Sequence, residues 1–347
     1  MNSNEFDLMV MIGRFEPLHN GHLGVLRHAK SLCPNLLILL GSSEQARTVK
    51  NPWTFDERRV MIEAALGDGM EKTYISPLYD HPYQENAWLV EVQDRVYQAC
   101  SFFNLDPKTA RIALIGREKD QSSYYLRSFP QWKVIDVQHT QVLSATELRN
   151  QFFSEDEGSD LLLRANLPKP CFALLDAFRK HSPAYQDLLA EWKFLNKYRE
   201  SWANAPYAPT FVTVDGVIEC AGHVLLIKRR SNPGKGLWAL PGGFINEGET
   251  LLKSVVREVL EETRVKLDHQ KPENMHVFDA PDRSLRGRTI THAFHFKLPD
   301  GPLPRVKGDH DPDKAIERVK WVPIAIAKTM REHFFEDHHA ILEHFLL

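Results

Sequence analysis

The sequence predicts an α/β protein of two domains, the first of them a doubly wound, Rossmann-like domain built on a parallel sheet. Three observations lead to this prediction. The chain has 347 residues, more than a single domain core usually holds. In its first half, short apolar runs alternate with amphipathic helical patterns. In its second half, a strand and a glycine-rich turn lead into a helix with clustered glutamates, at residues 242–265.

Composition narrows the class of protein. Hydrophobic residues make up 43% and charged residues 26% of the chain, as in globular proteins. The chain has 43 basic and 46 acidic residues, so its overall charge does not favour binding to nucleic acid. The N-terminus lacks a signal-peptide pattern, and no stretch approaches the ~20 apolar residues that span a bilayer. We therefore expect a cytoplasmic protein that binds neither nucleic acid nor membrane. Whether it forms a homo-oligomer is left open.

The four cysteines are isolated in the sequence and form no C-x-x-C pair. They are expected to be free thiols of a reducing compartment, most of them in the core. They are Cys33, Cys100, Cys171 and Cys220.

The first half contains continuous apolar runs that are typical of buried parallel strands. The runs lie at 8–12, 36–40, 73–78, 112–115 and 132–137. The helical patterns between and after them lie at 23–32, 57–66, 88–99 and 145–153. Polar residues follow Ile12, Leu40 and Ile115, at the carboxyl ends of strands, where ligands gather in this architecture.

A pair of histidines follows the first strand, in the segment G-R-F-E-P-L-H-N-G-H at residues 13–22. The start of a helix attracts anions, and Gly21 lets the backbone approach a ligand closely. His19 and His22 can donate hydrogen bonds to phosphate oxygens and stabilise developing charge. Either histidine alone is more often structural, so the combined spacing carries the interpretation.

A second helix start, S-A-T-E-L-R at residues 144–149, carries an arginine one turn in. Serine before a helical run is an ordinary N-cap, so Ser144 by itself indicates only a helix start. Arg149 is suited to bidentate contacts with phosphate oxygens.

Together these two segments resemble the signatures of the archaeal-type nicotinamide mononucleotide (NMN) adenylyltransferases. The first is similar to that family's G-R-F-x-P-x-H-x-G-H segment, and the second to its S-x-T-x-x-R segment. The resemblance covers roughly residues 7–165 and implies sites for ATP and NMN. It implies catalytic roles for His19, His22 and Arg149. It further implies ligand contacts from Gly13, Arg14, Phe15, Asn86, Trp88, Gly116, Lys119, Ser144 and Thr146.

Shorter segments agree with that resemblance. Residues 51–54, N-P-W-T, look like the family's N-P-F-T with Trp for Phe. Asn86 and Trp88 match its N-x-W, where an indole stacked on a cationic nicotinamide would be a cation–π contact. A lone Trp is more often a core residue, so Trp88 rests on the resemblance. Lys119 follows a strand and is a candidate for phosphate contact, whereas Gly116 is equally consistent with a turn.

Residues 166–205 connect the halves. Two amphipathic helical patterns there are too apolar on one face for a loose tether, so we expect them to pack on the first domain or between domains. A segment rich in Ala and Pro, residues 203–209, is a linker by composition. The predicted boundaries are 1–165 for the first domain, 166–205 for the connector and 206–347 for the second domain.

Three glutamates share one face of the helix in the second half. Glu258, Glu261 and Glu262 stand at i, i+3 and i+4. For three glutamates alone, a solvated acidic helix is the more common explanation. Because like charges repel, such a cluster after a Gly-Gly turn suggests a site for a hard cation, Mg²⁺ or alternatively Mn²⁺, that bridges to a substrate phosphate.

The full spacing resembles the Nudix box, G-x5-E-x7-R-E-U-x-E-E-x-G-U, in which U is aliphatic. The matching residues are Gly243, Glu249, Arg257, Glu258, Val259, Glu261, Glu262 and Val265. Arg264 departs from the pattern, because it stands where the family has a Gly that ends the helix in a left-handed conformation. The departure puts the geometry of that turn in doubt.

The Nudix resemblance implies an α/β/α sandwich with a mixed sheet. It implies that Glu258, Glu261 and Glu262 bind the metal, that Glu249 supports them, and that Arg257 orients the glutamates rather than touching substrate. A loop in related enzymes adds an acidic residue, for which Asp311 and Glu317 are candidates. The general base is left unassigned.

The two resemblances match a bacterial arrangement in which an NMN adenylyltransferase precedes a Nudix hydrolase. It implies conversion of NMN and ATP to NAD and pyrophosphate, and hydrolysis of ADP-ribose to AMP and ribose 5-phosphate. One alternative is another adenylyl- or cytidylyltransferase on the same fold. Another is that the Nudix half acts on a different nucleoside diphosphate derivative, or senses a ligand without turnover.

Overall fold

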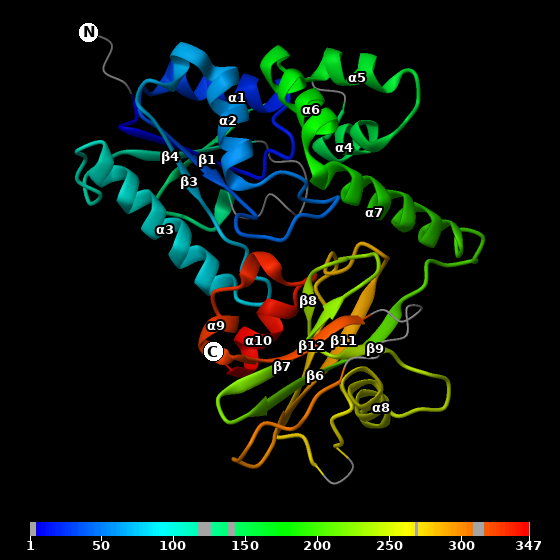
Figure 1. Cartoon of the computed structure of the whole chain (residues 1–347). Helices are drawn as coiled ribbons and strands as arrows, with labels where there is room; N and C mark the ends of the chain where they lie inside the picture. Colours follow the sequence, from blue (N-terminus) through cyan, green and yellow to red (C-terminus); the bar gives the residue numbers. More distant parts are fainter. Residues whose placement is uncertain (1–4, 117–125, 138–142, 268–269, 308–315, 347) are drawn as a thin grey trace. The chain divides into compact units, whose positions relative to one another are not determined.

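The computed structural model describes residues 5–116, 126–137, 143–267, 270–307 and 316–346. The chain divides into two compact units, Met1–Gln186 and Asp187–Leu347 (Figure 1). Within the described residues, no helix has the length and apolar character needed to cross a membrane. The domain boundaries inferred from the sequence stay predictions, because the division between units falls inside the long helix α7 (Pro183–Glu200).

The first unit is built on a five-stranded parallel sheet in the order β3-β2-β1-β4-β5. The strands are β1 (Leu8–Gly13), β2 (Leu36–Leu40), β3 (Thr73–Pro77), β4 (Ile112–Gly116) and β5 (Lys133–Asp136). The chain moves outward from β1 in one direction through β2 and β3, and then in the other through β4 and β5. This reversal beside the central strand confirms the predicted doubly wound fold and marks the sheet edge where ligands bind.

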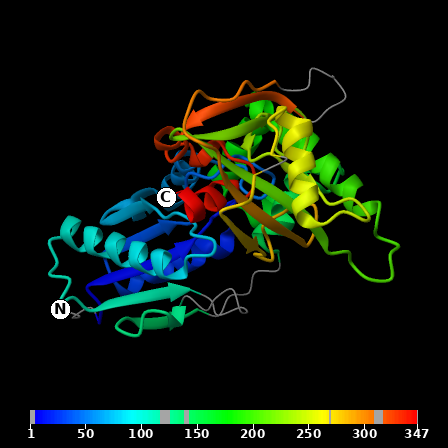
Figure 2. The same ribbon diagram turned by 90° about the horizontal axis from the view of Figure 1, so that it is seen from below.

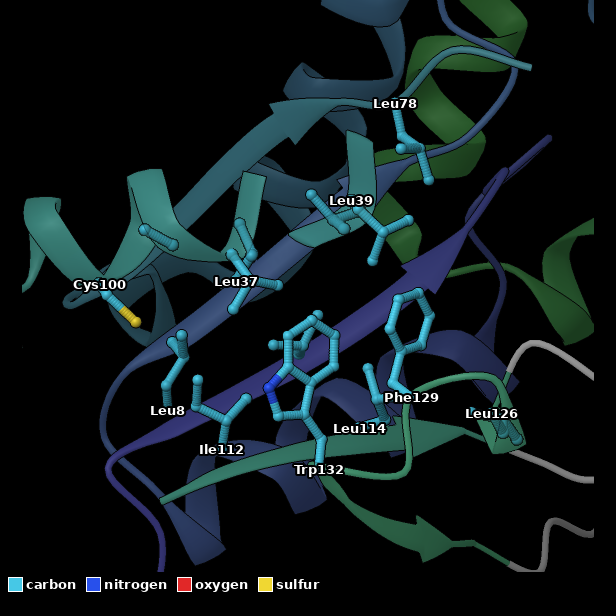
Figure 3. Packing of buried hydrophobic residues seen from close by; sticks show 14 residues of the cluster. Leu8, Leu37, Leu39, Leu78, Cys100, Ile112, Leu114, Leu126, Phe129 and Trp132 are labelled. Atoms are coloured by element: carbon cyan, nitrogen blue, oxygen red, sulfur yellow. The ribbon is translucent and has the colours of Figure 1, made fainter. Parts of the chain in front are cut away.

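Helices cover both faces of this sheet (Figure 1). The helices of this unit are α1 (Asn20–Leu32), α2 (Phe55–Leu66), the short η1 (Gly67–Met70), α3 (Glu85–Phe102), α4 (Ala145–Phe153), α5 (Ser159–Asn166) and α6 (Lys169–His181). Side chains of α3 pack on alternate residues of the buried strands, and Figure 3 shows that layer, with Leu37, Leu39 and Trp132 in it. Because alternate strand residues point to opposite faces, a second buried apolar layer, which includes Met9, Leu36 and Ile38, lies on the other face of the sheet.

The first connector helix packs on the first unit, in agreement with its apolar face. In α6, the Cys171 thiol lies 3.4 Å from the backbone oxygen of Met61 in α2. The four cysteines are all buried and free, as predicted. Burial raises the pKa of the Cys171 thiol to about 12.

The second unit has a seven-stranded mixed sheet. Its main path is β10-β11-β6-β7-β12, with β8 paired to β7 and β9 to β6. Only the β6–β11 pair is parallel among these described strands. The strands are β6 (Phe211–Cys220), β7 (His223–Arg229), β8 (Trp238–Ala239), β9 (Gly242–Phe244), β10 (Asn274–Phe278), β11 (Thr289–Lys297) and β12 (Ile316–Pro323).

Helix α8 (Leu251–Thr263) covers one face of this sheet, and α9 (Ile324–Ala327) and α10 (His338–Leu346) cover the other (Figures 1 and 2). A short helix, η3 (Arg331–His333), lies between α9 and α10 in the chain. Gly216 lets α8 approach the sheet, since a Cβ atom there would lie 2.8 Å from Cγ2 of Val259. The predicted α/β/α sandwich with a mixed sheet is confirmed.

Two candidate active sites

The predicted histidine pair lies where the chain passes from β1 into α1. His19 is the N-cap of α1, and its Nδ1 atom accepts a hydrogen bond from the backbone N–H of His22 at 3.2 Å. A neutral imidazole that accepts at Nδ1 carries its proton on Nε2 and can donate there. The two rings stack with centroids 3.6 Å apart. Both histidines therefore stand at a helix N-terminus on the ligand-binding edge of the sheet.

The backbone before the histidines is tightly packed. Phe15 has a φ angle of 54° and a buried ring that tilts against His22, with centroids 4.8 Å apart. A Cβ atom on Gly13 would lie 3.0 Å from this ring, so a larger residue there would press against Phe15. The Phe15 side chain thus shapes the loop from inside, and any ligand contact at this residue would come from its backbone.

The structure brings the arginine of the second motif to the histidine loop. Arg149 donates from Nη1 to the backbone oxygen of Glu16 at 2.5 Å and from Nη2 to Thr146 Oγ1 at 3.0 Å. Burial, with the nearby Arg14 charge, lowers the pKa of Arg149 to about 10. The Ser144 hydroxyl accepts the N–H of Glu147 at 3.3 Å in a capping box, so its observed role is the ordinary helix cap.

Other residues of this unit that were predicted to contact a ligand lie on α3 and at the end of β4. Asn86 lies exposed in the first turn of α3, and Trp88 is half-buried, packed against the core with its ring 6.2 Å from that of Phe129. Gly116 ends β4 and accepts the Val137 N–H at 2.9 Å. Lys119 lies outside the described residues. The gathering of these residues around one ligand stays a prediction.

Two buried ionisable residues at this site were not predicted. Glu16 and Arg58 are each 1% exposed, and Arg58 Nε lies 3.2 Å from Glu16 Oε1. Burial raises the pKa of Glu16 to about 8, against the opposing charge of Arg58. Both residues lie close to the motifs in the sequence. The available signal was one acidic residue within the 13–22 segment and one basic residue shortly after the 51–54 segment. The sequence does not reveal that they are in contact.

In the second unit, the glycine turn lies directly against the glutamates. A Cβ atom on Gly243 would lie 2.7 Å from Oε1 of Glu258, so a larger residue there would displace this carboxylate. The backbone N–H of Gly242 donates to Oε2 of Glu262 at 2.9 Å. The Gly-Gly pair predicted to begin the box thus forms one wall around two of its carboxylates.

Arg257 bonds most of the acidic residues of the box. Its Nε and Nη2 atoms contact both carboxylate oxygens of Glu249 at 2.8 and 3.1 Å. Its Nη1 atom lies 2.8 Å from Glu258 Oε1 and 3.3 Å from Glu261 Oε2. The hydrogen bonds from Arg257 lower the pKa of Glu249 to about 2. These contacts are those expected of a residue that orients glutamates.

The carboxylates suit a hard cation by their chemistry. Burial raises the pKa of Glu258, and raises that of Glu262 well above its ordinary value; the repulsion between these two glutamates adds to the rise at Glu262. A divalent cation would offset this accumulation of negative charge. In the part of the chain that the structure describes, no three acidic, histidine or cysteine side chains already gather around one point. Arg257 and the Gly242 N–H hold Glu258 and Glu262 instead.

Arg264 ends α8 in the conformation that the box normally assigns to glycine. It has φ 66° and ψ 9°, in the left-handed region, and its N–H donates to the Leu260 oxygen at 3.0 Å. The departure from the motif therefore leaves the turn geometry in place. Of the two acidic candidates downstream, Asp311 lies outside the described residues, and Glu317 forms an ion pair with Lys228 at 3.2 Å.

A buried polar group behind the glycine turn was also missed by sequence reasoning. Asp215 in β6 is 5% exposed and accepts from Thr291 Oγ1 at 2.5 Å. His338 Nε2 lies 4.0 Å from its Oδ1, while His338 Nδ1 accepts the Leu240 N–H at 3.0 Å. A Cβ atom on Gly242 would lie 2.6 Å from Asp215 Oδ1. The only signal was one acidic residue inside an apolar strand.

Comparison with known protein families assigns the two halves of the chain to two different families. Residues 10–151 match the cytidylyltransferase-like family, and residues 209–345 match the NUDIX domain family. A nicotinamide/nicotinic acid mononucleotide adenylyltransferase of Acinetobacter baylyi is 29% identical over 54% of this chain and 95% of its own length. An ADP-ribose pyrophosphatase of Methanocaldococcus jannaschii is 37% identical over 40% of this chain and 78% of its own length.

A solved structure covers both halves together. It is the bifunctional NMN adenylyltransferase/ADP-ribose pyrophosphatase of Francisella tularensis, in complex with AMP and a manganese ion. It is 34% identical to this chain, covers 98% of both chains, and superposes with a TM-score of 0.86. The likeness therefore extends over both motifs and the segment that joins them.

Proposed function

Since the chain belongs to the family of bifunctional NMN adenylyltransferase/ADP-ribose pyrophosphatases, we propose that its first unit makes NAD from NMN and ATP and that its second hydrolyses ADP-ribose. One observation carries the first assignment. The Arg149 guanidinium of the S-x-T-x-x-R motif bonds the backbone of the H-x-G-H loop at Glu16. Two signatures far apart in the sequence thus lie at one place on the sheet edge.

In adenylyl transfer, an oxygen of the NMN phosphate attacks the α-phosphorus of ATP, and pyrophosphate leaves. This reaction needs no protein nucleophile, so the site acts by alignment and by stabilising charge. His19 donates from Nε2 and His22 lies stacked beside it, next to the positive end of α1. Arg149 suits the β- and γ-phosphates of ATP, and the first turn of α3, with Asn86 and Trp88, suits the nicotinamide.

In the second unit, water attacks one of the two phosphorus atoms of ADP-ribose, and the pyrophosphate bridge breaks. Attack at the phosphorus of the ribose 5-phosphate releases AMP, and attack at the phosphorus of AMP releases ribose 5-phosphate. Both routes yield AMP and ribose 5-phosphate. Glu258, Glu261 and Glu262 are the residues that would hold a divalent cation, which supplies charge neutralisation and lowers the pKa of bound water. The manganese ion in the Francisella tularensis complex supports a divalent metal, and we propose Mg²⁺ as the usual ion. Arg257 keeps Glu249 and Glu258 in place.

A product assay on the whole protein tests both halves. We expect NMN and ATP to give NAD and pyrophosphate, and ADP-ribose to give AMP and ribose 5-phosphate, each only with Mg²⁺ or Mn²⁺ present. NADH and dinucleoside polyphosphates serve as competing Nudix substrates, and other phosphate acceptors compete with NMN. Preference for another acceptor would replace the first assignment. Tight ADP-ribose binding without products would make the second unit a sensing module.

A further inference from the structure

A buried arginine that belongs to neither signature joins two strand ends at the adenylyl-transfer site. Arg58 lies near the start of α2. Its Nη1 atom donates to the backbone oxygens of Arg14 and Gly41, both at 2.7 Å, and its Nη2 atom to that of Ser42 at 3.3 Å. Arg14 is the first residue after β1, and Gly41 is the first after β2. One guanidinium therefore fixes the backbone where both strands end.

The same backbone has a conformation that side-chain-bearing residues seldom adopt. Phe15 has φ 54° and Ser42 has φ 51°, both in the left-handed region. Such residues persist where surrounding contacts over-determine the backbone, and they concentrate at functional sites. Arg58 bonds the carbonyl immediately before Phe15 and that of Ser42 itself. Removing the guanidinium would release these carbonyls and let the loop relax.

Arg58 also reaches the second signature, through Glu16. Its Nε atom lies 3.2 Å from the Glu16 carboxylate, and both side chains are 1% exposed. The backbone oxygen of Glu16 accepts the hydrogen bond from Arg149 Nη1 at 2.5 Å. The position of the Arg149 guanidinium thus depends on Glu16, whose own position depends on Arg58. Loss of the Arg58 guanidinium would leave the buried Glu16 carboxyl group without this partner, which is unfavourable for a buried polar group.

We propose that Arg58 is a positioning residue for adenylyl transfer, one that sets the geometry of the loop between β1 and α1 and, through Glu16, of Arg149. The inference rests on the proposed function of this site. Arg58 is buried behind the loop and acts through these residues rather than on substrate. Misplacement of transition-state contacts lowers kcat. The contacts of Arg58 described above are with the ends of β1 and β2 and with Glu16, and not with the start of α3, where NMN is proposed to bind.

The test compares Arg58→Met and Arg58→Lys in the full chain. We expect Arg58→Met to lower kcat for NAD formation about 10- to 100-fold, with the KM for NMN changed less than about threefold and ADP-ribose hydrolysis unchanged. Arg58→Lys should lose activity too, because an ammonium does not reproduce the fork of a guanidinium. The Arg58→Lys variant also provides the test if Arg58→Met fails to fold.

Arg179 provides the matched control. It too bonds a carboxylate and a backbone oxygen of the first unit, at Asp160 (2.8 Å) and Phe152 (3.2 Å), but not the histidine loop. Arg179→Met should lower the melting temperature and leave kcat within about twofold. An equal loss of kcat in Arg179→Met, or an unchanged kcat in both Arg58 variants, would overturn the proposal.

A double-mutant cycle tests the route through Arg149. If Arg58 acts by placing Arg149, then adding Arg58→Met (or Arg58→Lys) to Arg149→Lys should reduce kcat far less than the product of the single effects. Additive effects would contradict that route. Wild-type protein that forms no NAD would instead refute the proposed function, and with it the premise of this inference.

Discussion

At the scale of single residues, His19 both caps α1 and offers a donor at Nε2, and the two roles can be separated. We expect His19→Ala to lower kcat for NAD formation by about 10²- to 10³-fold, the usual cost of losing one transition-state donor. Asparagine is a good N-cap, so His19→Asn restores the cap to the His22 N–H without the imidazole. Steady-state rates with NMN and ATP check this. Full activity in His19→Asn would show that capping alone matters.

Glu16 carries the clearest pH dependence in the first unit. Burial raises its pKa to about 8, against an ordinary value of 4.5. Between these values the native protein holds a proton there that the unfolded chain releases. Stability from this group is therefore fully present below pH 4.5 and is lost as pH rises through about 8.

Replacing Glu16 by Gln removes that titration while keeping the side-chain shape. We expect the melting temperature of wild-type protein to fall more steeply between pH 5 and pH 8 than that of Glu16→Gln. Thermal unfolding of both proteins in matched buffers measures the difference. Parallel curves would mean that Glu16 does not change its protonation state on unfolding in this range.

At the scale of elements, the end of α8 shows a mismatch between residue and conformation. Arg264 occupies the left-handed region at φ 66°, which costs a residue with a Cβ atom roughly 1–2 kcal/mol. Glycine avoids this cost but loses more chain entropy on folding, about 0.5–1 kcal/mol. We therefore expect Arg264→Gly to stabilise the second unit by about 0.5–1 kcal/mol, measured by denaturant unfolding. Arg264→Ala, which keeps the Cβ atom, is the control and should bring no such gain.

Elements whose signal is local were predictable from the sequence. The apolar runs of β1, β2 and β4, the helix starts at His19 and Ser144, and the face shared by Glu258, Glu261 and Glu262 each depend on neighbours within a few residues. The spacing of a motif therefore located the chemistry before any contact was known.

Contacts between elements were not predictable in the same way. Arg58 meets Arg14 and Glu16 only because α2 packs against the end of β1. Asp215 lies near His338 only because α10 covers the sheet below β6. A buried charge near a motif has no periodic pattern, so the sequence did not distinguish these residues from surface ones. The conformation of Arg264 was likewise open, since most residues at helix ends avoid it.

At the scale of the whole molecule, the residues proposed for the two reactions lie in different compact units, each with its own core. No residue is shared between the two described sets. Loss of one carboxylate in the second unit should then leave NAD formation unaffected. The two activities of one preparation also serve as folding controls for each other.

Glu262→Gln is the sharpest test of that independence. Glutamine keeps an oxygen that can accept the Gly242 N–H, so the turn should stay intact, while the charge that would bind a cation is lost. We expect ADP-ribose hydrolysis to fall at least about 100-fold, as loss of a metal ligand should exceed the 10- to 100-fold cost of losing its supporting contacts. The rate of NAD formation should change less than about twofold. Glu261→Gln, at the exposed end of the cluster, should follow the same pattern. Loss of both activities would show that the sites are coupled, and retained hydrolysis would remove Glu262 from the metal site.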